Sequence, residues 1–575
     1  MIQAIFINLS PLEKIVPGRN PVRVPGCLDG IPDTLRNAAA PINQGFLFRC
    51  VRMLFKGNPL TRPMDTAWVR KPLKRIPREH LILGAIFLLS LAFRLAFALQ
   101  SPAFSPEGYF ALRQVQHIRS TWLPLYEDPL SYGGRILVFQ PLFHYVLAAA
   151  SLVFSPVIAL QVLPNVLASS VVIVVYLLTF ELSRSTEASL TAAFLSAFVP
   201  VYVAETLNSL SVHALMVPLL FLFIYLFIRV KKEHELATPL LVVLATAALL
   251  HPSAFLLVLG LVFYILLVSM ERLERSRAEL EVTLFAIVSV LWLYFILFKR
   301  ILLFHGPSVV WQNIPLQVLS EHFSGFNLLG AVSLVGFLPF VFGSYAAYRF
   351  IVTERRRQVY LLTGFVLAVF LLLGMSLIPL SLGLIYLGMS LIPLFGLGYK
   401  LFLVELGNSK VERFSAWIRA GMLLLVVISS VLPSLGLAFE QLGKAPTREE
   451  FAAFSWLREH TPVGSTVLAT LEEGHLITAM ARRKNLIDGN FLMVDRPGQR
   501  LDDIERIYTT SSQTEALRLL QKYGVRYVLV SRAKGLYGIA NIPSADDRCF
   551  PRVYPEQDTD GPFILERRCE LEESA

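Results

Sequence analysis

The sequence predicts a polytopic α-helical membrane protein that ends in a small α/β domain. Hydrophobic residues make up 55% of the chain and charged residues only 16%, and the mean hydropathy is +0.58. Apolar runs of about 20 residues, long enough to cross a bilayer as a helix, recur between residues 81 and 440. From about residue 445 the composition changes to that of a soluble domain.

Residues 1–80 are expected to form a disordered cytoplasmic tail, because residues 1 to about 64 lack an apolar period and are rich in Pro, Asn and Gly. An alternative is that translation starts at Met64, directly ahead of a basic segment. The first long apolar run begins only at Leu81, so no cleavable signal peptide is evident.

The transmembrane domain is predicted over residues 81–440, with about eleven spans. The basic residues between Arg70 and Arg78 precede the first span and place the N-terminus in the cytoplasm. The predicted spans are 81–99, 161–182, 188–204, 211–229, 237–250, 254–270, 281–299, 326–350, 358–375, 384–403 and 417–438.

The apolar segment 141–156 decides the orientation of everything that follows it. If it lies flat on the outer face, as an interfacial helix within an external loop 100–160, all later basic clusters fall inside. If it crosses the bilayer, every one of them violates the positive-inside rule. We therefore expect a multi-pass plasma-membrane protein whose C-terminal domain, residues 445–575, is extracytoplasmic.

The net charge of +10 and the pI of 9.4 could indicate a nucleic-acid partner. The Lys and Arg residues, however, lie mostly beside apolar spans, where they set orientation. The sequence therefore predicts a lipid bilayer as the partner and no nucleic acid.

The C-terminal domain shows helix and strand patterns in alternation. Thr447 and Glu450 form a capping-box pattern ahead of an amphipathic helix, and Ser512 with Glu515 begins a second helix. The runs STVLATL and VRYVLV read as buried strands. These patterns predict a small α/β unit.

Cys549 and Cys569 flank a predicted hairpin with Asp560 and Gly561 near its turn. A disulfide between them is expected outside the cytosol, and two free thiols are the alternative.

Acidic residues follow two of the predicted spans at the outer face. Glu107 comes soon after the first span, Glu127 and Asp128 follow it, and Glu205 lies at the outer end of the third. Carboxylates bind divalent cations such as Mg²⁺ or Mn²⁺ and act as general bases. The alternative for Glu127 and Asp128, which precede Pro129, is a solvated turn.

Several of these motifs together resemble those of a known family. Residues 106–113, PEGYFALR, follow an N-inside first span, Tyr132-Gly-Gly-Arg135 and residues 140–145 come next, and a second acid follows the third span. With the external C-terminal domain, this order is similar to the GT-C superfamily of membrane glycosyltransferases, most closely to the catalytic subunit of archaeal and bacterial oligosaccharyltransferases.

The resemblance implies transfer of a sugar or oligosaccharide from a polyprenyl-phosphate or polyprenyl-pyrophosphate donor to a protein, lipid or glycan acceptor. Glu107 and Glu205 would be the catalytic acids and the metal ligands. Arg113, Arg135 or His213 would bind the donor phosphate, a role for which the planar guanidinium of arginine is suited.

The chain departs from the family at its acceptor motif. Where the family has Trp-Trp-Asp-Tyr-Gly, this chain has residues 470–474, TLEEG, so that Glu472, Glu473 and His475 mark the expected acceptor region. The Arg-aromatic pair of the family near the tenth span is replaced by residues 384–388, LIYLG. Glycosyl transfer is therefore expected in a general form rather than as protein N-glycosylation, and the alternative is a non-catalytic or transport-related protein that keeps the architecture.

Overall fold

The computed structural model describes residues 77–274, 277–324, 327–555 and 561–571. All of them belong to one compact unit, which extends from Leu73 to Ala575. The predicted tail over residues 1–80, with the alternative start at Met64, lies almost entirely outside the described residues.

Long apolar helices form most of the described chain and confirm the prediction of a polytopic membrane protein. Eight stretches among the described residues are long and apolar enough to cross a membrane. They are Arg78–Ala98 (α3), Ile158–Ser183 (η6, α6 and α7), His213–Val230 (α10), Pro252–Met270 (η8 and α12), Arg277–Glu321 (from α13, Arg277–His305), Arg357–Gly374 (α17), Leu380–Gly407 (α18) and Glu412–His460 (from α19, Ser415–Gly443).

Two further predicted spans are broken helices. The segment 188–204 forms α8 (Thr186–Ala197) and α9 (Pro200–Thr206), which bend by 45°. The segment 326–350 forms α15 (Leu328–Val335) and α16 (Phe337–Arg349), which the structure sets at 90°. The second break occurs at Gly336, whose φ of +104° is a conformation that side chains disfavour.

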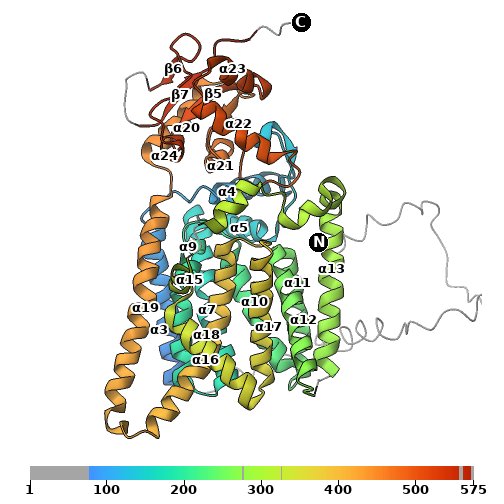
Figure 1. Cartoon of the computed structure of the whole chain (residues 1–575), viewed down its shortest axis with the longest axis vertical. Coiled ribbons are helices and arrows are strands. Elements are labelled where there is room, and N and C mark those ends of the chain that lie inside the picture. Colours follow the sequence, from blue (N-terminus) through green and yellow to red (C-terminus); the bar gives the residue numbers. More distant parts are fainter. Residues whose placement is uncertain (1–76, 275–276, 325–326, 556–560, 572–575) are drawn as a thin grey trace, which may run out of the picture. The chain divides into compact units, whose positions relative to one another are not determined.

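The expected count of about eleven spans exceeds the structural count by one. Segment 237–250 forms α11 (Ala237–Leu250), a helix of 14 residues and about 21 Å, against a hydrocarbon core of about 30 Å. His251 is extended and caps the next short turn, which ends α11 early. Its neighbour α10 runs alongside it (Figure 1).

The predicted external loop 100–160 contains two short helices. Helix α4 covers Gly108–Thr121 and α5 covers Leu142–Val153, with a small antiparallel pair, β1 (Glu127–Asp128) and β2 (Arg135–Ile136), between them. The 12 residues of α5 extend about 18 Å, too short to cross a bilayer. Figure 1 shows α4 and α5 at the end of the helical bundle that carries the C-terminal domain, here called the domain-side end.

The C-terminal domain contains a five-stranded mixed sheet with the strand order β4-β3-β5-β7-β6. Strand β3 pairs in parallel with β4 and β5, whereas β7 pairs antiparallel with β5 and β6. The strands are β3 (Thr466–Leu468), β4 (Lys484–Asn485), β5 (Val525–Val530), β6 (Arg552–Tyr554) and β7 (Phe563–Glu566). This sheet gives the predicted small α/β domain.

Helices cover this sheet, and two of them begin where the sequence predicts. Helix α20 (Arg448–His460) has the complete capping box of Thr447 and Glu450. Helix α23 (Gln513–Lys522) is capped by Ser512, which accepts a hydrogen bond from the Glu515 N–H. Three other helices are not evident from the sequence pattern: α21 (Gly474–Leu476), α22 (Pro497–Thr509) and α24 (Ala533–Tyr537).

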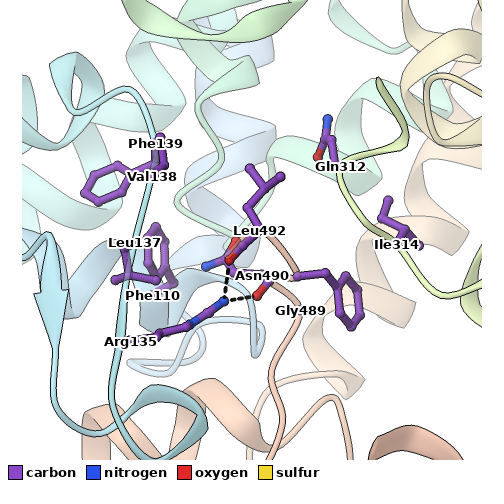
Figure 2. A pocket seen from close by; sticks show the side chains of 11 residues that line it. Phe110, Arg135, Leu137, Val138, Phe139, Gln312, Ile314, Gly489, Asn490 and Leu492 are labelled. Carbon is purple, nitrogen blue, oxygen red and sulfur yellow. Dashed lines mark hydrogen bonds between the residues drawn. The ribbon is translucent and has the colours of Figure 1, made fainter. Parts of the chain in front are cut away.

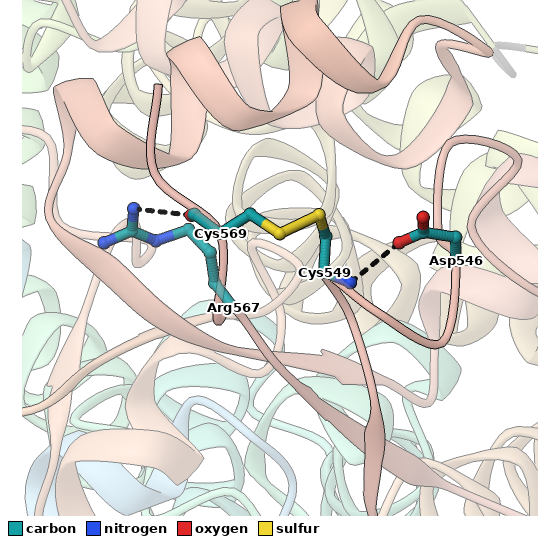
Figure 3. The surroundings of a disulfide bond; sticks show 4 residues. All are labelled: Asp546, Cys549, Arg567 and Cys569. Carbon is teal, nitrogen blue, oxygen red and sulfur yellow. Dashed lines mark hydrogen bonds between the residues drawn. A yellow bond between two sulfur atoms is a disulfide. The ribbon is translucent and has the colours of Figure 1, made fainter. Parts of the chain in front are cut away.

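A disulfide joins Cys549 and Cys569, with 4.8 Å between their Cα atoms. The bridge ties the segment before β6 to the segment after β7, so it closes the outer edge of the sheet (Figure 3). The Cys549 N–H donates to the Asp546 carboxylate at 2.8 Å, and Arg567 donates to the Cys569 carbonyl at 3.3 Å.

Replacing both cysteines with serine is expected to lower the unfolding free energy of this domain by about 3 kcal/mol, because the bridge restricts the unfolded chain. Trp456 fluorescence during denaturation measures this, since its ring lies 5.7 Å from that of Tyr554 in β6. Reduced wild-type protein is the matched control and should behave like the variant. Equal stability of oxidised and reduced protein would contradict the prediction.

Candidate functional site

Glu107 and Glu205 come together at the domain-side end of the bundle. The Ser105 N–H donates to the Asn208 carbonyl at 2.9 Å, and the Asn208 side chain donates to the Ala103 carbonyl at 2.6 Å. A Cβ at Gly108 would lie 2.9 Å from the Ser209 carbonyl, so this close approach requires glycine. The two carboxylates interact electrostatically, and Lys444 acts on Glu205 as well.

Two buried oxygens accompany this carboxylate pair. Ser105 Oγ and Asn208 Oδ1 have no hydrogen-bond partner among the described residues. Buried oxygens normally have partners, so these two are available to a ligand. The described part of the chain contains no group of three or more His, Cys, Asp or Glu residues that could hold a metal ion.

Arg94 fixes the helix that carries Glu205. Its side chain is 1% exposed, donates to Thr206 Oγ1 at 2.8 Å and lies over the Tyr202 ring at 5.0 Å. Arginine is rarely buried at membrane depth without a structural or functional reason. Here it fixes the residue next to Glu205 and therefore positions the carboxylate.

His213 lies in a buried polar cluster inside the bundle, next to this site. Its ring centroid is 4.7 Å from that of His251 and 6.5 Å from that of Tyr386. Tyr386 in turn interacts electrostatically with Glu205. His213 Nδ1 has no hydrogen-bond partner among the described residues, so it can accept or donate a bond to a ligand.

Arg113 and Asp128 bind each other. The two terminal guanidinium nitrogens of Arg113, Nη1 and Nη2, each donate to one oxygen of the Asp128 carboxylate at 2.6 Å. Asp128 also accepts from the Leu130 N–H at 2.9 Å, which shapes the turn after β1. Glu127, the next candidate acid, is exposed.

Arg135 holds the external loop against the C-terminal domain. It pairs with Asp488 at 2.8 Å, and the two side chains are 5% and 1% exposed. Its other nitrogens donate to Ser131 Oγ at 2.8 Å and to the carbonyls of Asn490 and Leu492. Ser131 also donates to Asp488 at 2.6 Å, and the Tyr132 N–H donates to Asn485. These five residues, Ser131, Tyr132, Arg135, Asn485 and Asp488, form what we call the latch.

The latch brings the predicted acceptor region to the external loop. Burial raises the pKa of Glu473, which accepts bonds from Thr470 and the Arg532 N–H. Exposed Glu472 pairs with the Arg532 guanidinium at 3.1 Å, so both acids are held within the domain.

His475 instead faces the external loop. Its ring lies 5.5 Å from that of Phe110, and it interacts electrostatically with Asp488, Arg135 and Glu107. Burial lowers the pKa of His475, so the ring is neutral at neutral pH. The structure therefore places His475 near Glu107 and leaves Glu472 and Glu473 bound to Arg532.

Solved structures of the archaeal oligosaccharyltransferase AglB from Archaeoglobus fulgidus are similar to this chain. The complex with an inhibitory peptide and a dolichol-phosphate has a TM-score of 0.60 at 17% identity, covering 80% of this chain and 70% of AglB. The form tethered to an acceptor peptide with the NVT sequon has a TM-score of 0.61 at 17% identity, with 86% and 74% covered. The complex with Zn and sulfate has a TM-score of 0.56 at 18% identity, with 84% and 73% covered.

No family profile and no curated protein matches the sequence. The fold is therefore assigned from the similarity of the three-dimensional structures. The chain has the GT-C fold. This result confirms the resemblance that the order of the sequence motifs indicated. The GT-C fold establishes the architecture, whereas the chemistry must be argued from the residues at the site.

Asp488→Asn is expected to weaken the attachment of the external loop by about 3–5 kcal/mol, because it leaves Arg135 buried without its counter-charge. Hydrogen exchange of backbone amides in residues 127–139 should rise. Glu281→Gln, in the exposed Arg277–Glu281 pair, is the matched control, since exposed pairs contribute about 0–1 kcal/mol. Unchanged exchange in Asp488→Asn would contradict the role of the latch.

Proposed function

We propose that this protein is a membrane glycosyltransferase that moves a sugar or oligosaccharide from a polyprenyl-phosphate or polyprenyl-pyrophosphate donor to an acceptor. The observation that carries the proposal is the carboxylate pair of Glu107 and Glu205 at the domain-side end of the bundle. The GT-C fold supports it, since AglB, which has the same fold, has been solved with a dolichol-phosphate.

The roles of the two acids follow from their surroundings. Glu205 lies beside the buried polar cluster of His213 and Tyr386, so we assign it to the donor side of the site. Glu107 is exposed at the start of α4 and lies near His475 of the C-terminal domain. Glu107 is therefore placed to take the proton of an acceptor group that arrives from solvent.

The donor phosphate requires a positive or hydrogen-bonding partner. Arg113 and Arg135 already bind Asp128 and Asp488, so their charge is largely compensated. His213 has an unpartnered ring nitrogen among the described residues. Lys444 acts on Glu205, and because its own pair with Glu440 at 3.2 Å is solvent-exposed, that pair compensates less of the lysine's charge. We therefore assign phosphate binding to His213 and Lys444 rather than to either arginine.

The carboxylate pair with Ser105 Oγ and Asn208 Oδ1 forms a small set of oxygen atoms that suits Mg²⁺ or Mn²⁺. A bound cation would neutralise charge that develops on the phosphate leaving group. With only two carboxylates, the affinity is expected to be low.

The positive-inside pattern supports an N-terminus in the cytoplasm and a domain-side end outside, and we propose the plasma membrane as the location. The C-terminal domain would then be extracytoplasmic, where a disulfide such as Cys549–Cys569 persists. The acceptor is a protein, a lipid or a glycan at the outer face.

Glu107→Gln and Glu205→Gln are each expected to lower transfer about 100-fold or more, because glutamine cannot accept the proton or neutralise a cation. Release of sugar from lipid-linked sugars, extracted from cells that lack the protein, measures this with purified enzyme. The matched control is Glu449→Gln, an exposed acid in the first turn of α20. If both site variants kept full transfer, the role of the carboxylate pair would be wrong. If wild-type protein transferred nothing, the proposed function would be wrong.

EDTA is expected to abolish transfer, and millimolar Mn²⁺ or Mg²⁺ should restore it. Asn208→Ala should raise the Mn²⁺ concentration needed for half-maximal activity roughly tenfold, as loss of a supporting contact does in other metal sites. Titration of EDTA-treated enzyme with Mn²⁺ measures both effects. Full activity in EDTA would contradict the role of a cation at this site.

A further inference from the structure

A solvent-exposed cavity opens beside the latch, where three segments meet, and the empty space within it and at its mouth is about 410 Å³. In Figure 2, Phe110 and Phe139 lie on one side of the cavity, Gln312 and Ile314 on the other, and Asn490 and Leu492 between them. The external loop, the loop after α13 and the C-terminal domain therefore each contribute a wall.

Aromatic rings form the wall from the external loop. Phe110 and Phe139 are half-buried, with ring centroids 5.4 Å apart and an interplanar angle of 83°. Tyr126 lies 5.5 Å from Phe139, and His475 lies 5.5 Å from Phe110. The faces of such rings suit flat, largely apolar surfaces, such as the C–H face of a sugar ring.

The polar groups of the lining are neutral or already neutralised. The side-chain amides of Gln312 and Asn490 each offer two N–H donors and one acceptor oxygen. Arg135 is the charged residue among those that line the cavity, and it binds Asp488 and two backbone carbonyls. Paired donors and acceptors without free charge match hydroxyl groups better than a phosphate or a peptide terminus.

The wall opposite the aromatic rings is held in a strained conformation. Gln312, Asn313 and Met493 have φ values of 51°, 56° and 60°. The Asn313 side chain donates to the carbonyls of Phe491 and Val494, and the Met493 N–H donates to His305 Nε2 at 2.9 Å. Strained residues of this kind persist where surrounding contacts fix them, often at ligand clamps.

We propose that this cavity is a subsite for one sugar ring, an inference that rests on the proposed glycosyl transfer. Phe110 follows Glu107 by three residues, so one turn of α4 separates the cavity from the carboxylate pair. A ring stacked on Phe110 and Phe139 and hydrogen-bonded to Gln312 and Asn490 lies beside the reaction centre. The ring belongs either to a glycan acceptor or to the sugar of the donor, because both present the same chemistry.

Saturation-transfer NMR of the full chain in lipid nanodiscs tests the subsite. The probes are methyl glycosides of glucose, galactose, mannose and N-acetylglucosamine, with the peptide acetyl-Asn-Ala-Thr-amide for comparison. At least one glycoside should show saturation and the peptide should not. Phe139→Ala and Gln312→Ala should each weaken glycoside binding about tenfold, and Phe139→Trp should retain it.

Phe370→Ala is the matched control, because Phe370 is a 53% exposed phenylalanine on α17. Absence of glycoside saturation, saturation of the peptide instead, or full binding by both cavity variants would each overturn the subsite. Farnesyl phosphate and farnesyl-phosphoryl-glucose identify the source of the sugar. Displacement of the glycoside by the glucose-bearing lipid alone assigns the cavity to the donor sugar, and persistence assigns it to the acceptor.

Failure of this inference and failure of the proposed function give different results. If no glycoside binds but Glu107→Gln loses transfer, the subsite is wrong and glycosyl transfer stands. If a glycoside binds but Glu107→Gln keeps full transfer, the subsite stands and the role of the carboxylate pair is wrong.

Discussion

The buried ion pair of Arg135 and Asp488 is the interaction on which the rest of the site depends. Removing two charges from water costs several kcal/mol for each ion, and a single contact rarely offsets this. Here Arg135 also donates to Ser131 and to two carbonyls, and Asp488 also accepts from Ser131 and Asn485. Because these hydrogen bonds satisfy the buried charges, the external loop is held firmly against the C-terminal domain.

This attachment of the external loop to the C-terminal domain has two consequences for the candidate site. It brings His475 of the C-terminal domain to Phe110, three residues after Glu107. It also forms the cavity between the external loop and residues 489–492 of the domain. Neither feature exists in the loop or in the domain alone, so the proposed binding and the proposed catalysis depend on the same contact.

The acids themselves are positioned by a different constraint within the helical bundle. Helix α9 is the second half of a broken span, and Arg94 fixes its end through Thr206. A break leaves backbone N–H and C=O groups without helical hydrogen bonds. Such groups are tolerated at membrane depth only where other parts of the protein or a water-filled cavity satisfy them. After this break, Asn208 forms hydrogen bonds with Ser105 and Ala103, so the segment that follows Glu205 contacts residues 103–108.

The sequence predicted the architecture well because hydrophobic length and charge flanks are local signals. It located the ten helical segments of the described chain that are apolar and long enough to cross a membrane, the capping box of α20, the N-cap of α23, and the strands β3 and β5. It placed the bounds of α11 correctly at residues 237–250 but counted this run of 14 residues as a full span, although a helix of that length is too short to cross a bilayer. It did not predict the break at Gly336, which depends on a backbone conformation rather than on hydropathy.

The sequence alone predicts a multi-span protein with Glu107 and Glu205 at the outer ends of two spans, because each acid follows its own apolar run. Which charges remain available to a ligand depends instead on the three-dimensional packing. Arg113 and Arg135 read as phosphate ligands in the sequence, yet Asp128 and Asp488 bind them. Asp488 is 353 positions from Arg135, and no local pattern identifies a partner at that distance. Pairing of buried charges depends on where the chain folds back, and that is a property of the whole fold.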